Sequence, residues 1–507
     1  MTGDQQRAYA DQLRQKQAAL MAQIGSMGGA QLAGLTNATN ALVVEISANQ
    51  AAAIAQLPGV AQVLPVGQYK LDLSTTVPYI GATALQGLGV NGTGVTVAVL
   101  DSGVDFMHYD LGGTGVLADY TTCYAQNAVA PSGLCASYFG PAAPKVIGGH
   151  DFVGENWTGA APNTVLQPDP NPIARAVTGG HGTNVSDIIL GRLGVAPGAK
   201  TYAYKVCSAV SSSCSGVAIL QGFDRALDPN ADGDLSDAVD VINLSLGASY
   251  GQRENSSVQA ANNASLVGSV VVVSAGNSAN RPFITGSPST ATSAISVAQT
   301  QVPTATGVPL IINPPATIAR TIVNTATLPW ALVGAGFSGN VRSTAASPAS
   351  PPGNDGCNGV SLPPLAGFVA LIRRGTCAIG EKVTNATLAG AVGVLIDNNA
   401  GGDPPSFAQG GTGPFGPTLI LSLADGNLIR SRLAAETINV STGAPVSAAG
   451  SLVTTSSRGP NMQLGMIKPD IGAPGASLSA DVGTGTGRSV FGGTSGAAPM
   501  VAGAAAL

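Results

Sequence analysis

The chain has 507 residues, of which 22 are Lys or Arg and 27 are Asp or Glu, so its formal net charge is −5. This acidic balance excludes the basic face of a nucleic-acid-binding protein, and the 44% hydrophobic content excludes a disordered chain. The 68 glycines show no three-residue period, which excludes collagen, and the length predicts roughly three domains.

Residues 1–74 predict a small module of their own. Residues 41–46 alternate like a strand, and Ser47 is a candidate N-cap for a helix over 48–57. After a Pro-Gly turn, residues 60–65 predict a second strand. The expected arrangement is therefore β-α-β.

From residue 75 onward, apolar β segments alternate with helical ones, which predicts an α/β fold with a parallel sheet. At Gln301 the composition becomes rich in Pro and Thr, and a separate α/β segment continues to residue 447. We therefore expect a core of residues 75–300 and 448–507 that is split by an inserted domain, 301–447. The clearest predicted elements are strands over 95–100, 201–206, 239–246 and 270–274 and helices over 182–193 and 256–266.

From its two ends, we expect the sequence to be a fragment of a longer chain. Residues 1–17 are polar and lack the apolar segment of a signal peptide, while the last residues stop inside a predicted helix without a cap. The uncharged stretch 489–507 contains Ser, Thr, Pro and several Gly, so it is a poor membrane span. We expect no membrane association.

Six cysteines form three pairs that are close in sequence: Cys123 with Cys135, Cys207 with Cys214, and Cys357 with Cys377. Six cysteines allow fifteen connectivities, so proximity alone indicates this pairing. The chain has three His and no CxxC spacing, which disfavours zinc. The even count favours disulfides and an oxidising compartment, with buried free thiols as the alternative.

Four polar residues have neighbours that indicate chemistry. Asp101 follows an apolar strand, where open α/β sheets place their sites, although an Asp there can simply form a turn. His181 is flanked by glycines at a predicted helix start, where an exposed or capping His is the alternative. Ser495 lies among small residues at a predicted helix N-terminus, which stabilises negative charge. Asn277 follows the strand 270–274, where it forms a turn or donates to an oxyanion.

In chain order, these motifs resemble those of the subtilisin-like serine proteases, the subtilases. Val-Leu-Asp101-Ser-Gly, Gly-His181-Gly-Thr, Ser-Ala-Gly-Asn277 and Gly-Thr-Ser495-Gly-Ala-Ala-Pro match the family's Asp, His, oxyanion and Ser motifs. The resemblance covers most of the chain and implies a three-layer subtilisin-like fold with an Asp-His-Ser triad and no catalytic metal. It also implies a substrate-binding set of Ser245, Leu246, Gly247, Ala275 and Gly276.

The sequence departs from the family pattern at Asn184, Gly496 and Met500, where a second His, a Met and a His are commoner. Residues 35–65 resemble the inhibitory propeptide of the family, and the insert 301–447 resembles a protease-associated (PA) domain. These resemblances imply a secreted, monomeric serine endopeptidase that acts on polypeptides and is made as a zymogen inhibited by its own propeptide. The alternative is a catalytically silent protein-binding module that uses the PA domain.

An acidic loop offers a second candidate site. Its oxygen-bearing side chains recur at short intervals and its sixth residue is Gly, as in the first half of a calcium loop. The twelfth position is Val239, which excludes an EF-hand. We expect a structural calcium ion here, with an acidic surface turn as the alternative. The candidate ligands are Asp228, Asn230, Asp232, Asp234 and Asp237.

Overall fold

A computed structural model of the chain divides it into two compact units, residues 1–70 and 71–507. None of the described helices is long and apolar enough to cross a membrane. The structure describes residues 3–35, 40–47, 50–61, 63, 73–162, 164–176, 180–334, 336–344, 356–357, 362–375, 377–400, 403–405, 407, 410, 413–462 and 465–507.

The first unit pairs one long helix with a two-stranded antiparallel sheet. It comprises α1 (Gly3–Ser26), β1 (Ala30–Leu35), β2 (Ala41–Glu45) and α2 (Ala51–Ile54). Sequence analysis did not predict α1, because few apolar residues mark its buried face.

The predicted strand over 41–46 forms as β2, and it pairs antiparallel with β1, which the sequence had not predicted. Residues 60, 61 and 63 are not in a strand, and the rest of the predicted second strand lies outside the described residues. Of the predicted helix 48–57, only the part around α2 is helical, and residues 48 and 49 also lie outside the described residues.

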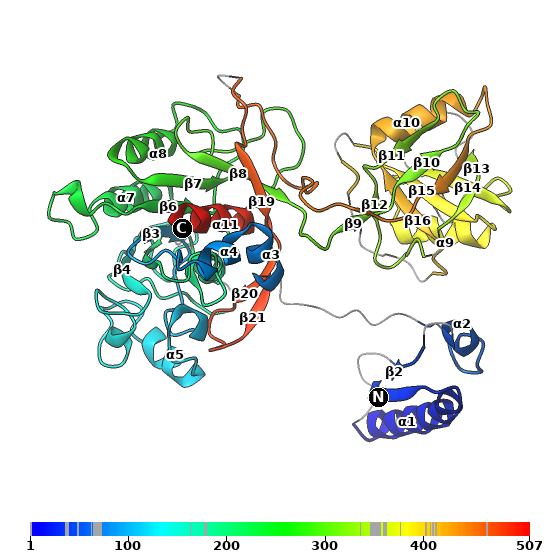
Figure 1. Cartoon of the computed structure of the whole chain (residues 1–507), viewed down its shortest axis with the longest axis horizontal. Helices are drawn as coiled ribbons and strands as arrows, with labels where there is room; N and C mark the ends of the chain where they lie inside the picture. The colour runs from blue at the N-terminus through cyan, green and yellow to red at the C-terminus, as the bar shows by residue number, and fades with distance from the viewer. Residues whose placement is uncertain are drawn as a thin grey trace. The chain divides into compact units, whose positions relative to one another are not determined.

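The core of the second unit is a seven-stranded sheet in which every pair of neighbours is parallel, which confirms the predicted α/β fold (Figure 1). In spatial order its strands are β19 (Ile471–Pro474), β8 (Ile295–Thr300), β7 (Val270–Ser274), β6 (Val241–Leu244), β3 (Thr96–Asp101), β5 (Lys200–Lys205) and β4 (Val146–Asp151).

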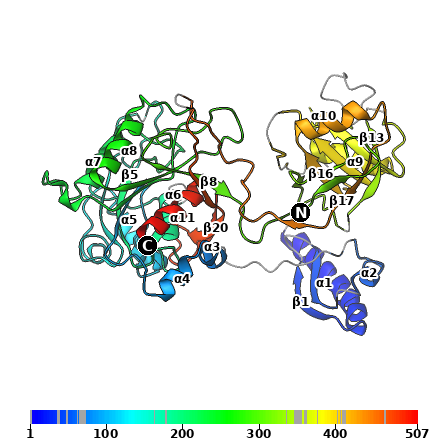
Figure 2. The same ribbon diagram turned by 45° about the horizontal axis from the view of Figure 1, so that its top comes forward.

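Helices cover both faces of this sheet. This arrangement buries the apolar side chains of β3, which point alternately to the two faces. Val97 and Val99 pack with α6 (His181–Leu190) and α11 (Thr494–Ala506), whereas Ala98 and Leu100 pack with α7 (Gly216–Leu227) and α8 (Ser256–Val267). Figure 2 labels these four helices. Because successive side chains of a strand point to opposite faces, one strand contributes to two separate cores. The result is three layers, with strand ends and helix starts meeting at the carboxyl edge of the sheet.

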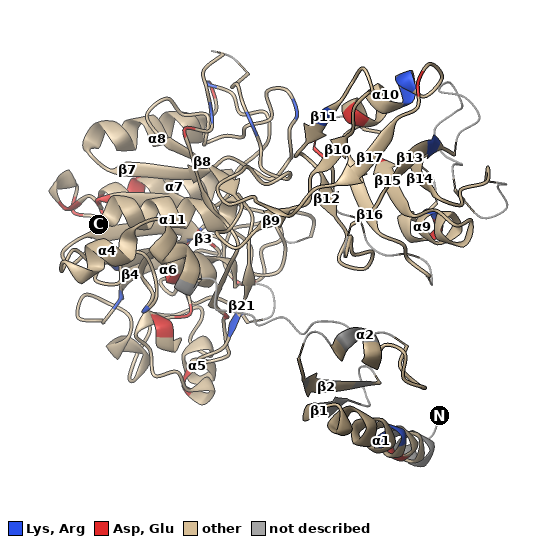
Figure 3. Cartoon of the chain, turned by 45° about the vertical axis from the view of Figure 1, so that its right-hand side comes forward, with Lys and Arg blue, Asp and Glu red and all other residues tan. Residues whose placement is uncertain are grey.

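Shorter elements complete the core. A hairpin of β20 and β21 packs near α6, and the remaining helices are short. Figure 3 shows that charged residues are few and are scattered over the chain. These elements are α3 (Leu73–Tyr79), α4 (Ala82–Gly87), η2 (Tyr109–Leu111), α5 (Leu117–Tyr124), η3 (Cys135–Ser137), η4 (Leu235–Asp237), β20 (Ser477–Ala480) and β21 (Arg488–Phe491).

The segment predicted as an insert has hydrophobic clusters separate from those of the parallel sheet. Its first and last strands, β9 (Thr306–Gly307) and β18 (Val446–Ser447), pair with each other, so the chain leaves and rejoins the core at neighbouring points. Its mixed eight-stranded sheet runs in the order β11-β10-β17-β13-β14-β15-β16-β12. The bounds are β10 (Leu310–Ile312), β11 (Arg320–Ile322), β12 (Ala326–Thr327), β13 (Ser338–Ser343), β14 (Phe368–Arg373), α9 (Ile379–Leu388), β15 (Gly393–Asp397), β16 (Thr418–Leu421), α10 (Leu423–Arg432) and β17 (Asn439–Thr442).

Candidate active site

Asp101 and His181 meet at the carboxyl edge of the parallel sheet. Asp101 is the last residue of β3 and is 2% exposed, and His181 is the first residue of α6. The Nδ1 of His181 donates to the Asp101 carboxylate, 2.8 Å from Oδ1 and 3.0 Å from Oδ2. The backbone N–H of Ser102 also donates to Oδ1, at 2.7 Å. The carboxylate therefore fixes the orientation of the imidazole and leaves its Nε2 for another partner.

Close packing at the start of α6 makes this pair possible. A Cβ atom on Gly182 would lie 2.3 Å from the carbonyl oxygen of Gly103, which no real side chain tolerates. The N–H of Gly182 instead donates to the Ser102 hydroxyl at 3.0 Å. The glycine after His181 is therefore a steric requirement, because any larger residue would push the helix start away from Asp101.

The surroundings of His181 favour its charged form. Burial on its own lowers the pKa of His181, but the negative charge of Asp101 and the hydrogen bond to it outweigh that effect, so the pKa is raised above 6.5. The ring of Phe491 meets the imidazole edge to face, with the ring centroids 4.9 Å apart. The sequence had given no indication of Phe491, since its contact depends on how the β20–β21 hairpin folds back.

Ser495 is the second residue of α11, so the predicted helix N-terminus is present. Its hydroxyl donates to the carbonyl oxygen of Ser245 at 3.1 Å, and the Ser245 hydroxyl donates back to the Ser495 carbonyl oxygen at 3.0 Å. Gly493, which precedes the helix, has a φ of 81°, a backbone conformation that favours glycine. The N-terminal end of the helix dipole is thus directed at the hydroxyl.

Asn277 follows β7 and is held by the residue before Ser495. Its Oδ1 accepts hydrogen bonds from the N–H of Thr494 at 2.9 Å and from the Thr494 hydroxyl at 3.1 Å. The same hydroxyl accepts from the N–H of Gly276 at 3.2 Å. Because the carboxamide oxygen is engaged, its orientation is set and the Nδ2 group is presented on the other side. Thr494 is a second residue that the sequence analysis missed.

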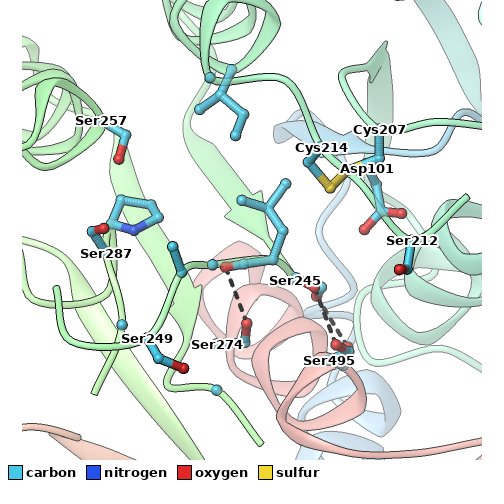
Figure 4. Close-up of a pocket in the computed structure, with 18 of the residues that line it drawn as sticks. Asp101, Cys207, Ser212, Cys214, Ser245, Ser249, Ser257, Ser274, Ser287 and Ser495 are labelled. Atoms are coloured by element: carbon cyan, nitrogen blue, oxygen red, sulfur yellow. Dashed lines mark hydrogen bonds between the residues drawn. A yellow bond between two sulfur atoms is a disulfide. The ribbon is translucent and has the colours of Figure 1, made fainter. Parts of the chain in front are cut away.

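Asp101, His181, Asn277 and Ser495 line one cavity of about 930 Å³. Figure 4 shows part of this cavity, with Asp101 and Ser495 labelled. Such a volume is typical of a ligand-binding cleft. It brings together residues from β3, α6, α11 and the segments that follow β6 and β7. Its lining includes Asp101, His181, Asn277 and Ser495 together with the five expected substrate-binding residues Ser245, Leu246, Gly247, Ala275 and Gly276.

The cysteines form disulfides in the pairs that are close in sequence: Cys123–Cys135, Cys207–Cys214 and Cys357–Cys377. Both Cys207 and Cys214 also line the cavity, which sequence reasoning did not anticipate. Among the described residues, three ligand atoms of His, Cys, Asp and Glu side chains come within 4.8 Å of one another only at Cys357, Cys377 and Glu381. Two of these are joined as a disulfide, so they are not available as thiolate ligands.

The acidic loop is exposed and its acceptors bind its own backbone. The Asp228 carboxylate accepts from the N–H groups of Asp232 and Gly233, and the N–H of Asp232 also donates to Asn230. Asp234 accepts from the N–H of Ser236. The donor set of oxygen atoms suits calcium chemically, but a bound ion would rely on lone pairs that these bonds leave over.

Comparison with known proteins identifies the family. Residues 92–507 match the family model described as "Subtilase family". The chain belongs to the subtilase family. This confirms the resemblance drawn from the sequence motifs.

Two curated relatives agree with this assignment. The chain is 31% identical to the minor extracellular protease Vpr of Bacillus subtilis (strain 168), over 86% of this chain and 48% of that protein. It is 29% identical to the subtilisin-like protease SBT3.9 of Arabidopsis thaliana, over 91% and 62% of the two chains. The chain thus spans about half to two thirds of the length of these curated relatives. A crystal structure of the psychrophilic subtilisin-like protease Apa1 from the Antarctic psychrotroph Pseudoalteromonas sp. AS-11 aligns with 15% identity and a TM-score of 0.31, over 84% and 85% of the two chains.

Proposed function

We propose that this subtilase is a secreted serine endopeptidase that hydrolyses peptide bonds through an acyl-enzyme. The observation that carries this proposal is the convergence of a carboxylate-bound imidazole, a serine at a helix N-terminus and an oriented carboxamide on one cavity. Each group has the chemistry that one step of acyl transfer needs.

Asp101 and His181 would provide the base. The carboxylate holds the proton on Nδ1, so Nε2 is free to accept the Ser495 proton, and the resulting imidazolium is stabilised by the same carboxylate. Ser495 donates to the Ser245 carbonyl in the present conformation, so its hydroxyl must leave that acceptor as substrate binds. The serine oxygen then attacks the scissile carbonyl, and His181 passes its proton to the leaving amine.

Asn277 would stabilise the oxyanion of the tetrahedral intermediate. Its Nδ2 donor is pre-oriented by Thr494, and the Ser495 N–H lies at the N-terminus of α11, where backbone donors favour negative charge. The substrate would lie as an extended strand along Ser245–Gly247, with main-chain hydrogen bonds giving broad specificity.

We further propose that the first unit is an inhibitory propeptide and that the insert is a PA domain. The compact division of the chain at residue 70 and the resemblance of residues 35–65 to propeptides support the first assignment. Self-cleavage would then fall between Pro65 and Pro78. The disulfides and the extracellular relative from Bacillus subtilis support secretion.

The test compares the full chain with its Ser495→Ala variant, both folded. We expect the unsubstituted chain to hydrolyse denatured casein and to lose its first unit during expression, whereas the variant does neither. Equal processing of both would overturn self-cleavage. A folded chain that binds polypeptide without hydrolysing it would overturn the peptidase and favour the silent binding module.

A further inference from the structure

A short disulfide-closed loop forms one wall of the cleft. Cys207 and Cys214 are bonded to each other, and both line the cavity together with Ser208, Val210, Ser211 and Ser212. Figure 4 shows the disulfide beside Asp101, across the cleft from the residues around Ser287. None of the catalytic steps above uses this bond, so its position calls for another role.

The base of the loop is anchored to the strand that ends in Asp101. The carbonyl oxygen of Asp101 accepts from the N–H of Val206 at 2.8 Å and from the N–H of Cys207 at 3.1 Å. On the other side, the N–H of Ser215 donates to the carbonyl oxygen of Val206 at 3.0 Å, and the Ser215 hydroxyl caps α7. Both ends of the loop are therefore fixed independently of the disulfide.

Hydrogen bonds also hold the body of the loop: the N–H of Ser208 donates to the carbonyl oxygen of Ser213 at 2.9 Å, and the Ser211 hydroxyl donates to the carbonyl oxygen of Thr158 at 3.0 Å. Four of the six residues between the cysteines are serine, and Ala209 alone is a buried hydrophobic residue. The hydroxyl of Ser208 donates to the carbonyl oxygen of Trp157 at 2.6 Å and accepts from Val210 and Ser211. Because the body of the loop buries little apolar surface and each of its hydrogen bonds contributes modestly, the disulfide is the one covalent restraint that closes the wall.

We propose that the Cys207–Cys214 disulfide is a positioning element of the substrate cleft, which keeps the loop ready for an extended peptide. A loop that is already ordered spares the bound complex the entropy of ordering it. Reduction by a dithiol would therefore weaken peptide binding without disabling Ser495. In that step the disulfide takes two electrons and two protons to become two thiols, and the dithiol becomes a cyclic disulfide. This inference rests on the proposed peptidase function.

The first experiment compares two double variants of the full chain, Cys207→Ser/Cys214→Ser and Cys123→Ser/Cys135→Ser. Cys123 and Cys135 are bonded and buried but do not line the cavity, so this pair controls for loss of a crosslink. For a peptide that spans the cleft, we expect KM to rise about tenfold in the first variant only, with kcat within about twofold of the unsubstituted chain. Hydrolysis of a small activated ester, which occupies only the cleft around Ser495, stays unchanged in both variants.

The second experiment requires no variant to fold well. The unsubstituted chain is treated with dithiothreitol, its freed thiols are alkylated and located by mass spectrometry, and KM is followed in parallel. We expect KM to rise as Cys207 and Cys214 become labelled, and the Cys207→Ser/Cys214→Ser variant to be insensitive. An unchanged KM after labelling of these two cysteines, or an equal KM in both double variants, overturns the proposal. Absence of hydrolysis by the untreated chain overturns the peptidase function instead.

Discussion

The cleft around Ser495 and the acidic loop over Asp228–Asp237 are both polar, but their polar groups have different partners. In the cleft, His181 binds Asp101, 80 positions away, and Ser495 binds Ser245, 250 positions away. In the loop, the side-chain oxygens accept from backbone N–H groups no more than five positions away; the acceptors are Asp228, Asn230, Asp232 and Asp234.

The difference in hydrogen-bond partners distinguishes side chains that can react from side chains that only stabilise the structure. In the cleft, a partner from a distant element binds one atom of a side chain, and another atom of the same side chain faces the cavity. Asn277 is an example, because its carboxamide oxygen is held by Thr494 and the residue lines the cavity. Partners from the same turn satisfy the side chain locally and stabilise the turn. Substitutions in the cleft should therefore change rates, and substitutions in the loop should change stability at most.

The largest effect should come from Asp101→Asn. The variant cannot hold the reactive tautomer of His181 or stabilise its positive form, so kcat should fall by about 10⁴-fold. Peptide hydrolysis under saturating substrate measures this. The matched control is Asp234→Asn in the acidic loop, which should keep full kcat. Equal losses in the two variants would break the distinction between cleft and loop.

The pH dependence of hydrolysis tests whether Asp101 sets the pKa of His181. His181 must be neutral to accept a proton, and its pKa is raised above 6.5 because the effect of Asp101 exceeds that of burial. Activity is therefore complete above the raised pKa and is lost as the pH falls through it. In Asp101→Asn the raising cause is gone, so the acidic limb of the residual kcat/KM should move to lower pH. A limb that stays in place would show that Asp101 does not set this pKa.

The next effect should come from Asn277→Ala. Loss of one oxyanion donor should lower kcat about 10²–10³-fold with little change in KM, a range based in part on another subtilase. Steady-state kinetics with one peptide substrate provide the measurement. Asn280 lies in the same loop but is exposed and does not line the cavity, so Asn280→Ala should be kinetically silent. A large rise in KM without a change in kcat would place Asn277 in ground-state binding instead.

A buried cluster of charged side chains that bind one another differs from both the cleft and the loop. We expect substitutions in it to change stability more than substitutions in the loop do. Lys205 is fully buried and binds Asp151 at 2.8 Å as well as Glu155. Lys205→Met leaves those carboxylates without their cation, so the free energy of unfolding should fall by about 3–5 kcal/mol. Denaturant unfolding measures it, with the exposed Arg281→Met as a control expected within about 0.5 kcal/mol. Equal unfolding energies of the Lys205→Met variant and the unsubstituted chain would contradict the role of this cluster.

The smallest effect concerns the acidic loop. We propose that it binds a structural calcium ion, so a chelator should lower the midpoint of thermal unfolding by about 5 °C. The Asp234→Asn variant should lose most of this response and keep its hydrolytic rate. A midpoint that ignores the chelator would show that the loop is an acidic turn stabilised by its own hydrogen bonds.

Elements of the fold that depend on a strong local sequence pattern could be predicted from the sequence. The apolar runs that became β3 and β7 and the Gly-rich stretch around His181 are visible in the sequence because burial and close packing restrict which residues fit. The order of Asp101, His181 and Ser495 predicted the family, and the family model confirms it.

Other features depend on contacts that no local pattern records. Helix α1 has few apolar residues, and the pairing of β1 with β2 depends on a partner that the sequence did not reveal. The contact of Phe491 with His181 and the position of the Cys207–Cys214 disulfide in the cleft arise only when distant elements fold together.

The most direct test of the account is covalent labelling of the folded chain with a fluorophosphonate, which reacts with a serine only when a base activates it. We predict one labelled residue, Ser495, in the unsubstituted chain, and loss of labelling in folded His181→Ala. A folded chain whose Ser495 stays unlabelled, or labels equally without His181, would contradict the claim that these residues form a working catalytic site.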